Sequence, residues 1–229
     1  MNVPQPEPRF LLTYPSMPPR GLFISLEGSD GSGKSSQIQI LAAALRKKGL
    51  RVRVTGEPGG TPFGAKLRRI LLDPGTGRLN PKSEAFLYEA ARVEHLDKVI
   101  LPALKSGTWV LCSRFSDSTL AYQGAARGLP ISELSGLDRW ATGGLKPDLT
   151  LILDLAPGLG LKRVRGRGKA DRFEAEGLVF QKKVRAYFKS LSKREAERVK
   201  IVSAAGTRDM VFGRIWVQVS KFLERKHGR

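Results

Sequence analysis

The chain has 229 residues and a formal net charge of +19, with 40 Lys and Arg against 21 Asp and Glu. Hydrophobic residues make up 41% of it, an ordinary share for a globular protein, and no apolar run approaches the ~20 residues that a membrane-spanning helix needs. The one cysteine, Cys112, excludes an intrachain disulfide. We therefore expect neither a membrane protein nor a disulfide-stabilised secreted protein.

The first 20 residues contain six prolines and little periodicity, which predicts an irregular N-terminal extension. This stretch lacks the apolar core of a secretory signal, and with Glu7 and few basic residues it is unlike a transit peptide. We therefore expect a cytoplasmic protein.

From Gly21 onward, short apolar strands alternate with helical stretches. Strands are predicted at residues 22–26, 51–55, 108–112, 149–154 and 199–203, and helices at 34–48, 62–72, 82–104, 131–142, 157–165, 173–196 and 207–226. Five such strands separated by helices predict an α/β fold with a parallel sheet covered on both faces. The sequence shows no internal repeat, so residues 21–229 are expected to form a single domain.

The loop after the first strand carries the most informative motif. Residues 28–35 read Gly-Ser-Asp-Gly-Ser-Gly-Lys-Ser, the G-x-x-x-x-G-K-[ST] pattern of a phosphate-binding P-loop. Its glycines allow backbone N–H groups to surround a phosphate, Lys34 reaches the β- and γ-phosphate oxygens, and Ser35 binds Mg²⁺. The strand before it and the helix start after it complete an anion site. The predicted phosphate-binding residues are Gly28, Ser29, Asp30, Gly31, Ser32, Gly33, Lys34, Ser35 and Ser36.

The positive charge is uneven along the chain. Residues 161–229 hold 20 Lys and Arg against 7 Asp and Glu, a net charge of +13, whereas residues 1–160 hold 20 against 14, a net charge of +6. Two interpretations are open: a surface for polyphosphate or nucleic acid, and a set of solvated helix faces. Four arginines within residues 163–172 favour a specific role for that segment, whereas the generally basic exterior is weak evidence for nucleic-acid binding.

Several further segments follow the predicted strands in a characteristic order. They are Glu57-Pro58-Gly59-Gly60-Thr61-Pro62 after the second strand, Tyr88, Arg92 and His95 on the long helix, Arg114 to Gly124 after the third strand, Pro147-Asp148-Leu149-Thr150 entering the fourth, and Leu161 to Glu174 after it. Together with the P-loop, and in this spacing, residues 21–226 resemble bacterial thymidylate kinase. The resemblance implies the P-loop nucleoside monophosphate kinase fold, with a five-stranded parallel sheet and a short arginine-rich lid at about residues 160–174. It also implies transfer of the ATP γ-phosphoryl group to dTMP with Mg²⁺, for dTTP synthesis, by a homodimer.

The resemblance assigns the acceptor side of the reaction to loops at the ends of the strands. Arg114 follows the third strand, at the edge where ligands of open α/β sheets bind, and by resemblance it holds the dTMP phosphate. Glu57 and Pro58 are expected beside the substrate. Asp30 is unusual in a phosphate loop because its carboxylate would repel the donor phosphates. By resemblance it meets the dTMP sugar or organises metal and water.

Two aromatic residues, Tyr88 and Tyr122, are expected to hold the nucleoside. Tyr88 and Arg92 are four residues apart and share one helix face. By resemblance, Tyr88 stacks on thymine and Arg92 hydrogen-bonds a carbonyl of thymine. The alternative for this pair is a core tyrosine beside an exposed arginine. Tyr122 matches the family tyrosine that lies beneath the deoxyribose and excludes a 2′-hydroxyl, with Thr119 and Gln123 nearby.

The segment after the fourth strand resembles the lid. Glycines between its arginines give it the mobility that a closing flap needs. The P-loop holds no basic residue before Lys34, so the chain resembles the branch of the family whose catalytic arginines lie in the lid. Arg163 and Arg167 are therefore expected to meet the transferring phosphoryl group, and Arg172 the ATP phosphates. An arginine in such a role is worth about 10³–10⁵ in rate in related chemistry.

Four positions carry small or uncharged residues where the family has charged ones: Gly56, Ala65, Ala91 and Ser113. Ser113 replaces the Asp of an Asp-Arg pair, and a serine is a weaker Mg²⁺ ligand than a carboxylate because it carries no charge. We expect compensation by another acid, with Asp30, Glu57 and Asp117 as candidates.

Two other functions stay open at this stage. One is phosphorylation of another nucleoside monophosphate, or of a deoxynucleoside, on the same fold. The other is a catalytically weakened P-loop protein that binds nucleotide, or that binds nucleic acid through its basic surface.

Overall fold

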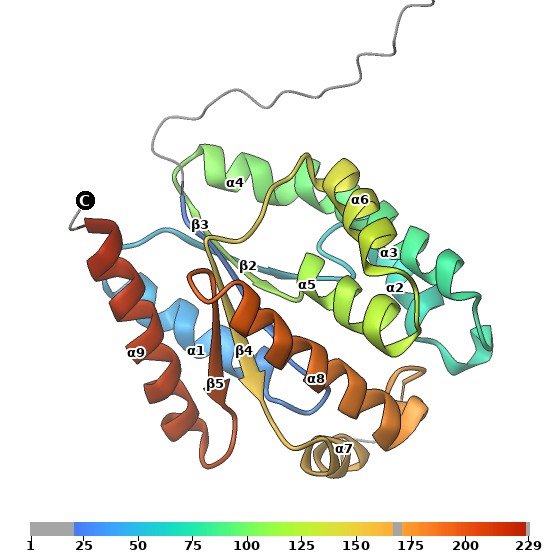
Figure 1. The fold of residues 1–229 in the computed structure, drawn as a ribbon. Helices are drawn as coiled ribbons and strands as arrows, with labels where there is room; N and C mark the ends of the chain where they lie inside the picture. Colours follow the sequence, from blue (N-terminus) through green and yellow to red (C-terminus); the bar gives the residue numbers. More distant parts are fainter. Residues whose placement is uncertain (1–20, 167–170, 228–229) are drawn as a thin grey trace, which may run out of the picture.

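The computed structural model describes residues 21–166 and 171–227, whose arrangement Figure 1 shows. The predicted extension at residues 1–20 and Arg167 of the predicted lid lie outside these residues. Within the two described ranges, every helix is too short or too polar to cross a membrane.

Five parallel strands form one sheet in the order β2-β3-β1-β4-β5. They are β1 (Phe23–Glu27), β2 (Val52–Gly56), β3 (Trp109–Ser113), β4 (Leu149–Asp154) and β5 (Val199–Ser203). The expected α/β fold with a five-stranded parallel sheet is confirmed. The strands could be predicted because nearly continuous apolar runs are typical of parallel strands buried on both faces.

Helices cover both faces of the sheet (Figure 1). They are α1 (Lys34–Lys47), α2 (Pro62–Leu72), α3 (Pro81–His95), α4 (Leu101–Lys105), α5 (Ser116–Thr119), α6 (Ile131–Thr142), α7 (Pro157–Arg165), α8 (Gly177–Arg194) and α9 (Arg208–His227). On one face, Leu41 of α1 and Ile215 of α9 belong to one apolar cluster with Leu26 of β1. On the other face, α4 and α8 cover the sheet through two further clusters.

The structure differs from the predicted helices in two places. The helix predicted at 82–104 is divided into α3 and α4 by a wider π-type turn at Leu96–Ile100. Helical backbone also occurs at 116–126, where α5 continues into a second π-type turn at Leu120–Ala126. The Ser-, Thr- and Gly-containing sequence there has weak helix propensity, and packing of Ala121 and Tyr122 against α8 stabilises it instead.

All strands end at the same edge of the sheet. Gly56 of β2 lies opposite Ser113 of β3, and Glu27 of β1 lies opposite Ile152 of β4. The P-loop, the Glu57 turn and Arg114 therefore leave the sheet side by side. Because β1 lies between β3 and β4, the topology alone brings these separate motifs together.

Candidate active site

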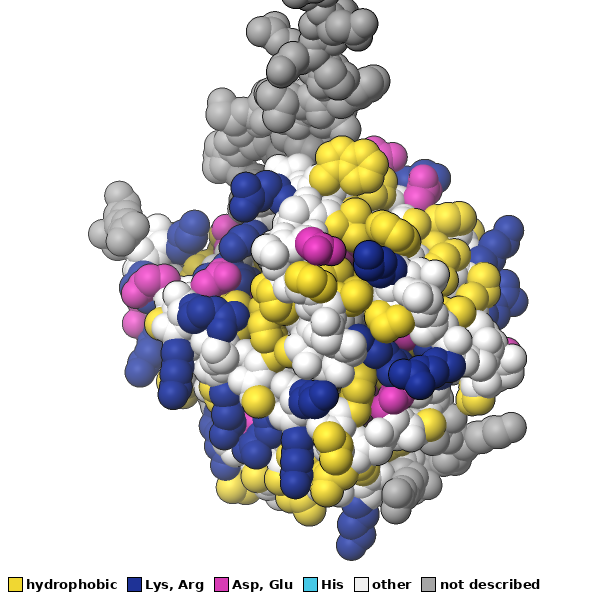
Figure 2. Space-filling view, turned by 45° about the vertical axis from the view of Figure 1, so that its right-hand side comes forward, with side chains coloured by type: hydrophobic (Ala, Val, Ile, Leu, Met, Phe, Trp, Pro, Cys, Tyr) yellow, Lys and Arg dark blue, Asp and Glu magenta, His cyan; other side chains and the backbone are white. Residues whose placement is uncertain are grey.

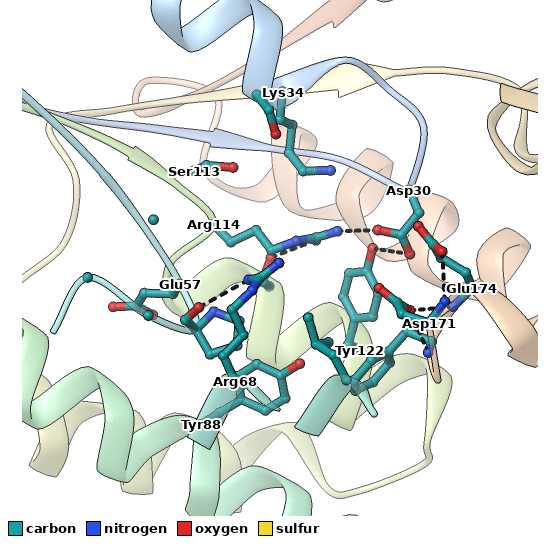
Figure 3. A pocket seen from close by; sticks show the side chains of 18 of the residues that line it. Asp30, Lys34, Glu57, Arg68, Tyr88, Ser113, Arg114, Tyr122, Asp171 and Glu174 are labelled. Atoms are coloured by element: carbon teal, nitrogen blue, oxygen red, sulfur yellow. Dashed lines mark hydrogen bonds and ion pairs between the residues drawn. The ribbon is translucent and has the colours of Figure 1, made fainter. Parts of the chain in front are cut away.

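A cavity of about 740 Å³ opens at this edge of the sheet. Its walls come from the P-loop, the turn after β2, helices α2 and α3, the end of β3, residues 118–123, residues 171–174 and the start of α9. The volume lies within the ~300–1,000 Å³ typical of small-ligand sites. In Figure 3, Lys34 and Ser113 lie on one side of the cavity, and Arg114 extends across it toward Asp30.

The P-loop curves around the ammonium group of Lys34. Gly33 caps α1 in a left-handed conformation (φ 92°), which leaves Ser35 and Ser36 exposed on the cavity wall. Lys34 Nζ donates hydrogen bonds to the carbonyl oxygens of Gly28 (2.9 Å) and Ser29 (3.0 Å). A positive charge and the amino-terminal end of a helix thus face the same space, which is the physical requirement for binding a phosphate.

The P-loop also contacts α7, the helix that leads into the predicted lid. A Cβ atom on Gly31 would lie 2.3 Å from the carbonyl oxygen of Gly160, and one on Gly160 would lie 2.4 Å from that of Asp30. Only glycines allow backbones to approach so closely. Arg163 of α7 adds a hydrogen bond from Nη1 to the Gly31 carbonyl (3.4 Å). The base of the lid therefore packs directly on the loop predicted to hold the donor.

Arg114 lies in a strained turn that directs its side chain into the cavity. Among the described residues other than glycine, it alone has a positive φ (69°), a conformation that costs ~1–3 kcal/mol. Its backbone N–H donates to the Leu26 carbonyl (3.0 Å). The guanidinium pairs with Asp30 and lies 4.8 Å from the centre of the Tyr122 ring (Figure 3).

Asp30 turns toward these acceptor-side residues. Its carboxylate pairs with Arg114 and accepts hydrogen bonds from Gln181 Nε2 (2.9 Å) and the Tyr122 hydroxyl (3.4 Å). Burial pushes the pKa of Asp30 upward, but Arg114 and Lys34 outweigh burial, so the pKa lies below its usual value. Asp30 is therefore ionised at neutral pH and holds Arg114 and Tyr122 in place.

Glu27 is a site residue that the sequence motifs did not reveal. It is fully buried, and its carboxylate accepts hydrogen bonds from the Phe115 N–H (2.7 Å) and the Ser118 hydroxyl (2.6 Å). Ser118 in turn accepts a hydrogen bond from Arg114 Nη1 (3.3 Å). Glu27 thus braces the strained turn on both sides of Arg114. Glu27 directly precedes the P-loop, and an acid that joins a buried strand to a predicted site is a functional candidate that could have been identified from sequence.

An aromatic pocket lies below Arg114. Tyr88 and Tyr122 both meet the ring of Phe173 edge-on, with ring centres 6.1 Å and 5.9 Å apart. Thr119 and Gln123 lie on the same cavity wall, and Gln123 donates to the buried Glu84 (2.7 Å). Flat apolar surfaces beside a few fixed polar groups suit a nucleoside.

The structure places Arg92 behind the cavity wall. Its guanidinium is 1% exposed and pairs with Glu57 (2.8 Å), Asp138 (3.0 Å) and Glu89, besides donating to Thr119 (3.0 Å). In this conformation the donors of Arg92 are directed at these buried partners, and its contact with a thymine carbonyl stays a prediction. The alternative of an exposed arginine is wrong. Burying a charge requires such partners, and they come from distant segments.

Comparison with known proteins decides the family. A family model described as "Thymidylate kinase" matches residues 26–215. The chain belongs to the thymidylate kinase family. The thymidylate kinase of Syntrophotalea carbinolica is 47% identical over 212 residues, which cover 90% of this chain and 98% of that protein. The thymidylate kinase of Deinococcus radiodurans is 45% identical over 208 residues, covering 91% and 99%.

A solved structure supports the same grouping. The crystal structure of thymidylate kinase from Ehrlichia chaffeensis matches with a TM-score of 0.70 and 30% identity, over 90% of this chain and 99% of that chain. The suggested resemblance to the thymidylate kinase family and the expected P-loop kinase fold are therefore confirmed.

The described residues at the two ends of the predicted lid contact the rest of the protein. Arg172, expected to bind ATP phosphates, is buried: Nε donates to the Leu71 carbonyl (2.8 Å) and Nη2 pairs with Glu84 (2.7 Å). Arg127 also pairs with Glu84 (3.2 Å). In this conformation Arg172 anchors the end of the predicted lid, and its contact with the ATP phosphates stays a prediction.

Two arginines that the motifs did not single out line the cavity. Arg68 of α2 donates from Nη1 to the Pro58 carbonyl (3.1 Å) and lies beside Tyr88 in Figure 3. Arg208 is the first residue of α9. Neither belongs to a recognisable sequence motif, and only the folding of α2 and α9 toward the P-loop reveals them.

The cavity fits Mg²⁺ bound chiefly through nucleotide phosphates. Mg²⁺ typically takes one or two protein oxygens and completes its shell with phosphates and water. The hydroxyls of Ser35 and Ser113 and the carboxylate of Asp30 line the cavity. In the described parts of the chain, no cluster of three or more His, Cys, Asp or Glu side chains would hold a metal by itself.

Two of the four departures from the family pattern lie side by side in the sheet. Gly56 and Ser113 occupy paired positions on neighbouring strands, so the usual Arg and Asp are absent together. Asp117 cannot compensate for Ser113, because both its oxygens are bound by Arg198 (2.8 and 3.0 Å) away from the cavity. Glu57 lines the cavity, but its oxygens bind Arg92 and His95.

Proposed function

We propose that this chain phosphorylates dTMP to dTDP with ATP, for the synthesis of dTTP. The observation that carries the proposal is the single cavity joining the P-loop lysine, Lys34, to the arginine that ends β3, Arg114. Phosphoryl transfer requires a protein mainly to align two substrates and to neutralise charge, and a cavity with fixed cations meets both requirements. Membership of the thymidylate kinase family supports the same pair of substrates.

On the donor side, Lys34 and the backbone N–H groups of the P-loop bind the β- and γ-phosphates of ATP. Ser35 would hold Mg²⁺ together with the phosphates, and the metal would supply positive charge that neutralises the transferring group. Asp30 and Ser113 line the same cavity and would supply further oxygens to the metal. Arg163 starts from its position against Gly31 and reaches the phosphoryl group when the lid closes, with Arg167 in the same role.

On the acceptor side, Arg114 binds the dTMP phosphate by exchanging its pairing with Asp30 for the substrate. Tyr88 flanks the thymine ring. Tyr122 lies beneath the deoxyribose and leaves no room for a 2′-hydroxyl. Glu57, Pro58, Thr119 and Gln123 form the wall, and Arg92 holds Glu57 and Thr119 from behind.

We also infer that the protein is a cytoplasmic homodimer. Large apolar side chains are exposed on adjacent helices α2, α3 and α6: Phe63, Ile70, Phe86, Val93 and Trp140. Figure 2, in which this side comes forward, shows hydrophobic side chains gathered on the surface. Exposed apolar groups that cluster in this way mark an interaction surface, and a second copy of the same face would cover them.

A coupled assay of ADP release with dTMP, dUMP, dCMP, AMP and GMP tests the proposal. Mg²⁺-dependent turnover that is fastest with dTMP is the expected result. Faster turnover with another monophosphate would identify a different nucleotide kinase. Absence of turnover with all five, together with salt-dependent DNA binding, would indicate a weakened nucleotide-binding protein.

A further inference from the structure

Arg208 is a cation on the cavity wall that the proposed reaction does not yet use. It is exposed, it begins α9, and it shares the cavity with Lys34, Ser35 and Ser36. Among the residues that the structure describes, no carboxylate pairs with its guanidinium, whereas Arg114 of the same cavity pairs with Asp30.

The backbone of Arg208 is fixed next to the P-loop helix. Gln37 immediately follows Ser36 in the first turn of α1, and its Nε2 donates a hydrogen bond of 2.8 Å to the Arg208 carbonyl. Gln37 is buried, so the donor of this hydrogen bond is held in place by its surroundings. The pairing of α1 with α9 in the apolar core keeps the two helix starts together. A hydrogen bond therefore holds the backbone of Arg208 beside the first turn of α1, which directly follows the P-loop.

We propose that Arg208 is a ligand of the donor nucleotide and pairs with its α-phosphate. Lys34 lies inside the P-loop curve, where the β- and γ-phosphates are expected, and the acceptor residues lie at the Arg114 end of the cavity. Arg208 joins the cavity wall at the start of α9, which Gln37 links to the first turn of α1. An arginine pairs strongly with a phosphate because its N–H groups match two oxygens at once. The inference rests on the proposed use of ATP.

Calorimetric binding of ATP, ADP and adenosine to the full chain, without dTMP, tests this contact. Arg208→Gln is expected to raise the Kd of ATP and ADP about tenfold (~1.4 kcal/mol) and to leave that of adenosine unchanged. Arg208→Lys keeps the charge and should recover part of the affinity. Lys221→Gln removes one exposed charge from the same helix, away from the cavity, and should leave all three Kd values as they are.

An unchanged ATP Kd in Arg208→Gln would overturn the proposal. So would an equal loss for adenosine, which would place the arginine on the base, or an equal effect of Lys221→Gln, which would indicate only the general charge of the protein. Failure of the wild type to bind ATP would refute this proposal and the proposed function together. If ATP binding weakens as expected but no dTMP is turned over, the donor contact stands and the proposed acceptor is wrong.

Discussion

Lys34 contributes charge to the donor site and little to the apolar core. Its ammonium group is held by the carbonyls of Gly28 and Ser29, in the curve of the loop where ATP phosphates are proposed to bind. Lys34→Ala should therefore lower kcat for dTMP phosphorylation at least tenfold, equivalent to ~1.4 kcal/mol of transition-state stabilisation. Steady-state kinetics measures this, with circular dichroism to verify the fold. A variant that keeps more than about a tenth of kcat would contradict the donor role.

Glu27 acts through the residues that it braces. Its pKa is raised to about 7, chiefly by burial and further by the charge of Asp117. In the unfolded chain, a glutamate titrates near pH ~4.3. Between these values the folded protein keeps a proton that the unfolded chain has lost. The free energy of unfolding therefore decreases as pH rises through this window, and the loss is complete above pH ~7.

Glu27→Gln should flatten this dependence, because the amide cannot ionise. Between pH 5 and pH 8, the decrease in unfolding free energy should be smaller in the variant than in the wild type, by on the order of 2 kcal/mol. Urea unfolding at the two pH values measures it. Identical pH dependence of the two proteins would show that Glu27 does not titrate in this range.

Side-chain positions could be predicted where a local motif determines them, but not where they depend on partners that are distant in sequence. Lys34 and Arg114 could be placed from sequence because a contiguous motif and a strand end determine where they lie. Arg92 and Arg172 could not, because the acids that bind them, Glu57 and Glu84, are distant in sequence. Only the folded chain shows which charges are paired and buried.

At the scale of elements, the strands could be predicted from their composition, whereas the places where helices are interrupted could not. Apolar runs predicted every strand to within one residue, since a central parallel strand must be apolar on both faces. The π-type turns at Leu96–Ile100 and Leu120–Ala126 have no comparable signature, because packing against neighbouring elements decides where a helix widens.

The anchor at the end of the lid can be distinguished experimentally from a phosphate ligand. Arg172 pairs with Glu84, which is fully buried, so Arg172→Gln leaves that carboxylate with less compensation. We expect a loss of ~2–3 kcal/mol in unfolding free energy, below the ~3–5 kcal/mol for breaking a buried pair because Arg127 remains beside Glu84.

The KM for ATP should change little in Arg172→Gln at a temperature where the variant is folded. Lys162→Gln, which removes an exposed charge from α7, controls for the general charge of the lid and should leave stability unchanged. Denaturant unfolding and ATP kinetics on both variants decide between the two roles. A large rise in KM at undiminished stability would support the predicted phosphate contact.

For the whole molecule, the proposed dimer face lies in the less basic part of the chain. Residues 161–229, which include α8 and α9, carry a net charge of +13, against +6 for residues 1–160. The exposed apolar side chains of α2, α3 and α6 belong to the less charged part, and a groove of about 170 Å³ lies between α3 and α6. The proposed association through this face would keep the strongly basic part of each copy away from the contact, which would limit repulsion.

Trp140 is the side chain that most directly tests this dimer. It is 79% exposed on α6, a large apolar area to leave in water unless a partner covers it. Light scattering should give the wild type a mass of twice 25.2 kDa. Trp140→Glu should shift the protein toward monomer, because each symmetric contact would bury an unpaired carboxylate twice. Val217→Glu, a matched change of an exposed apolar residue on α9, should leave the dimer intact. Dissociation by Val217→Glu alone would move the interface to the α1 and α9 side, and a monomeric wild type would refute the homodimer.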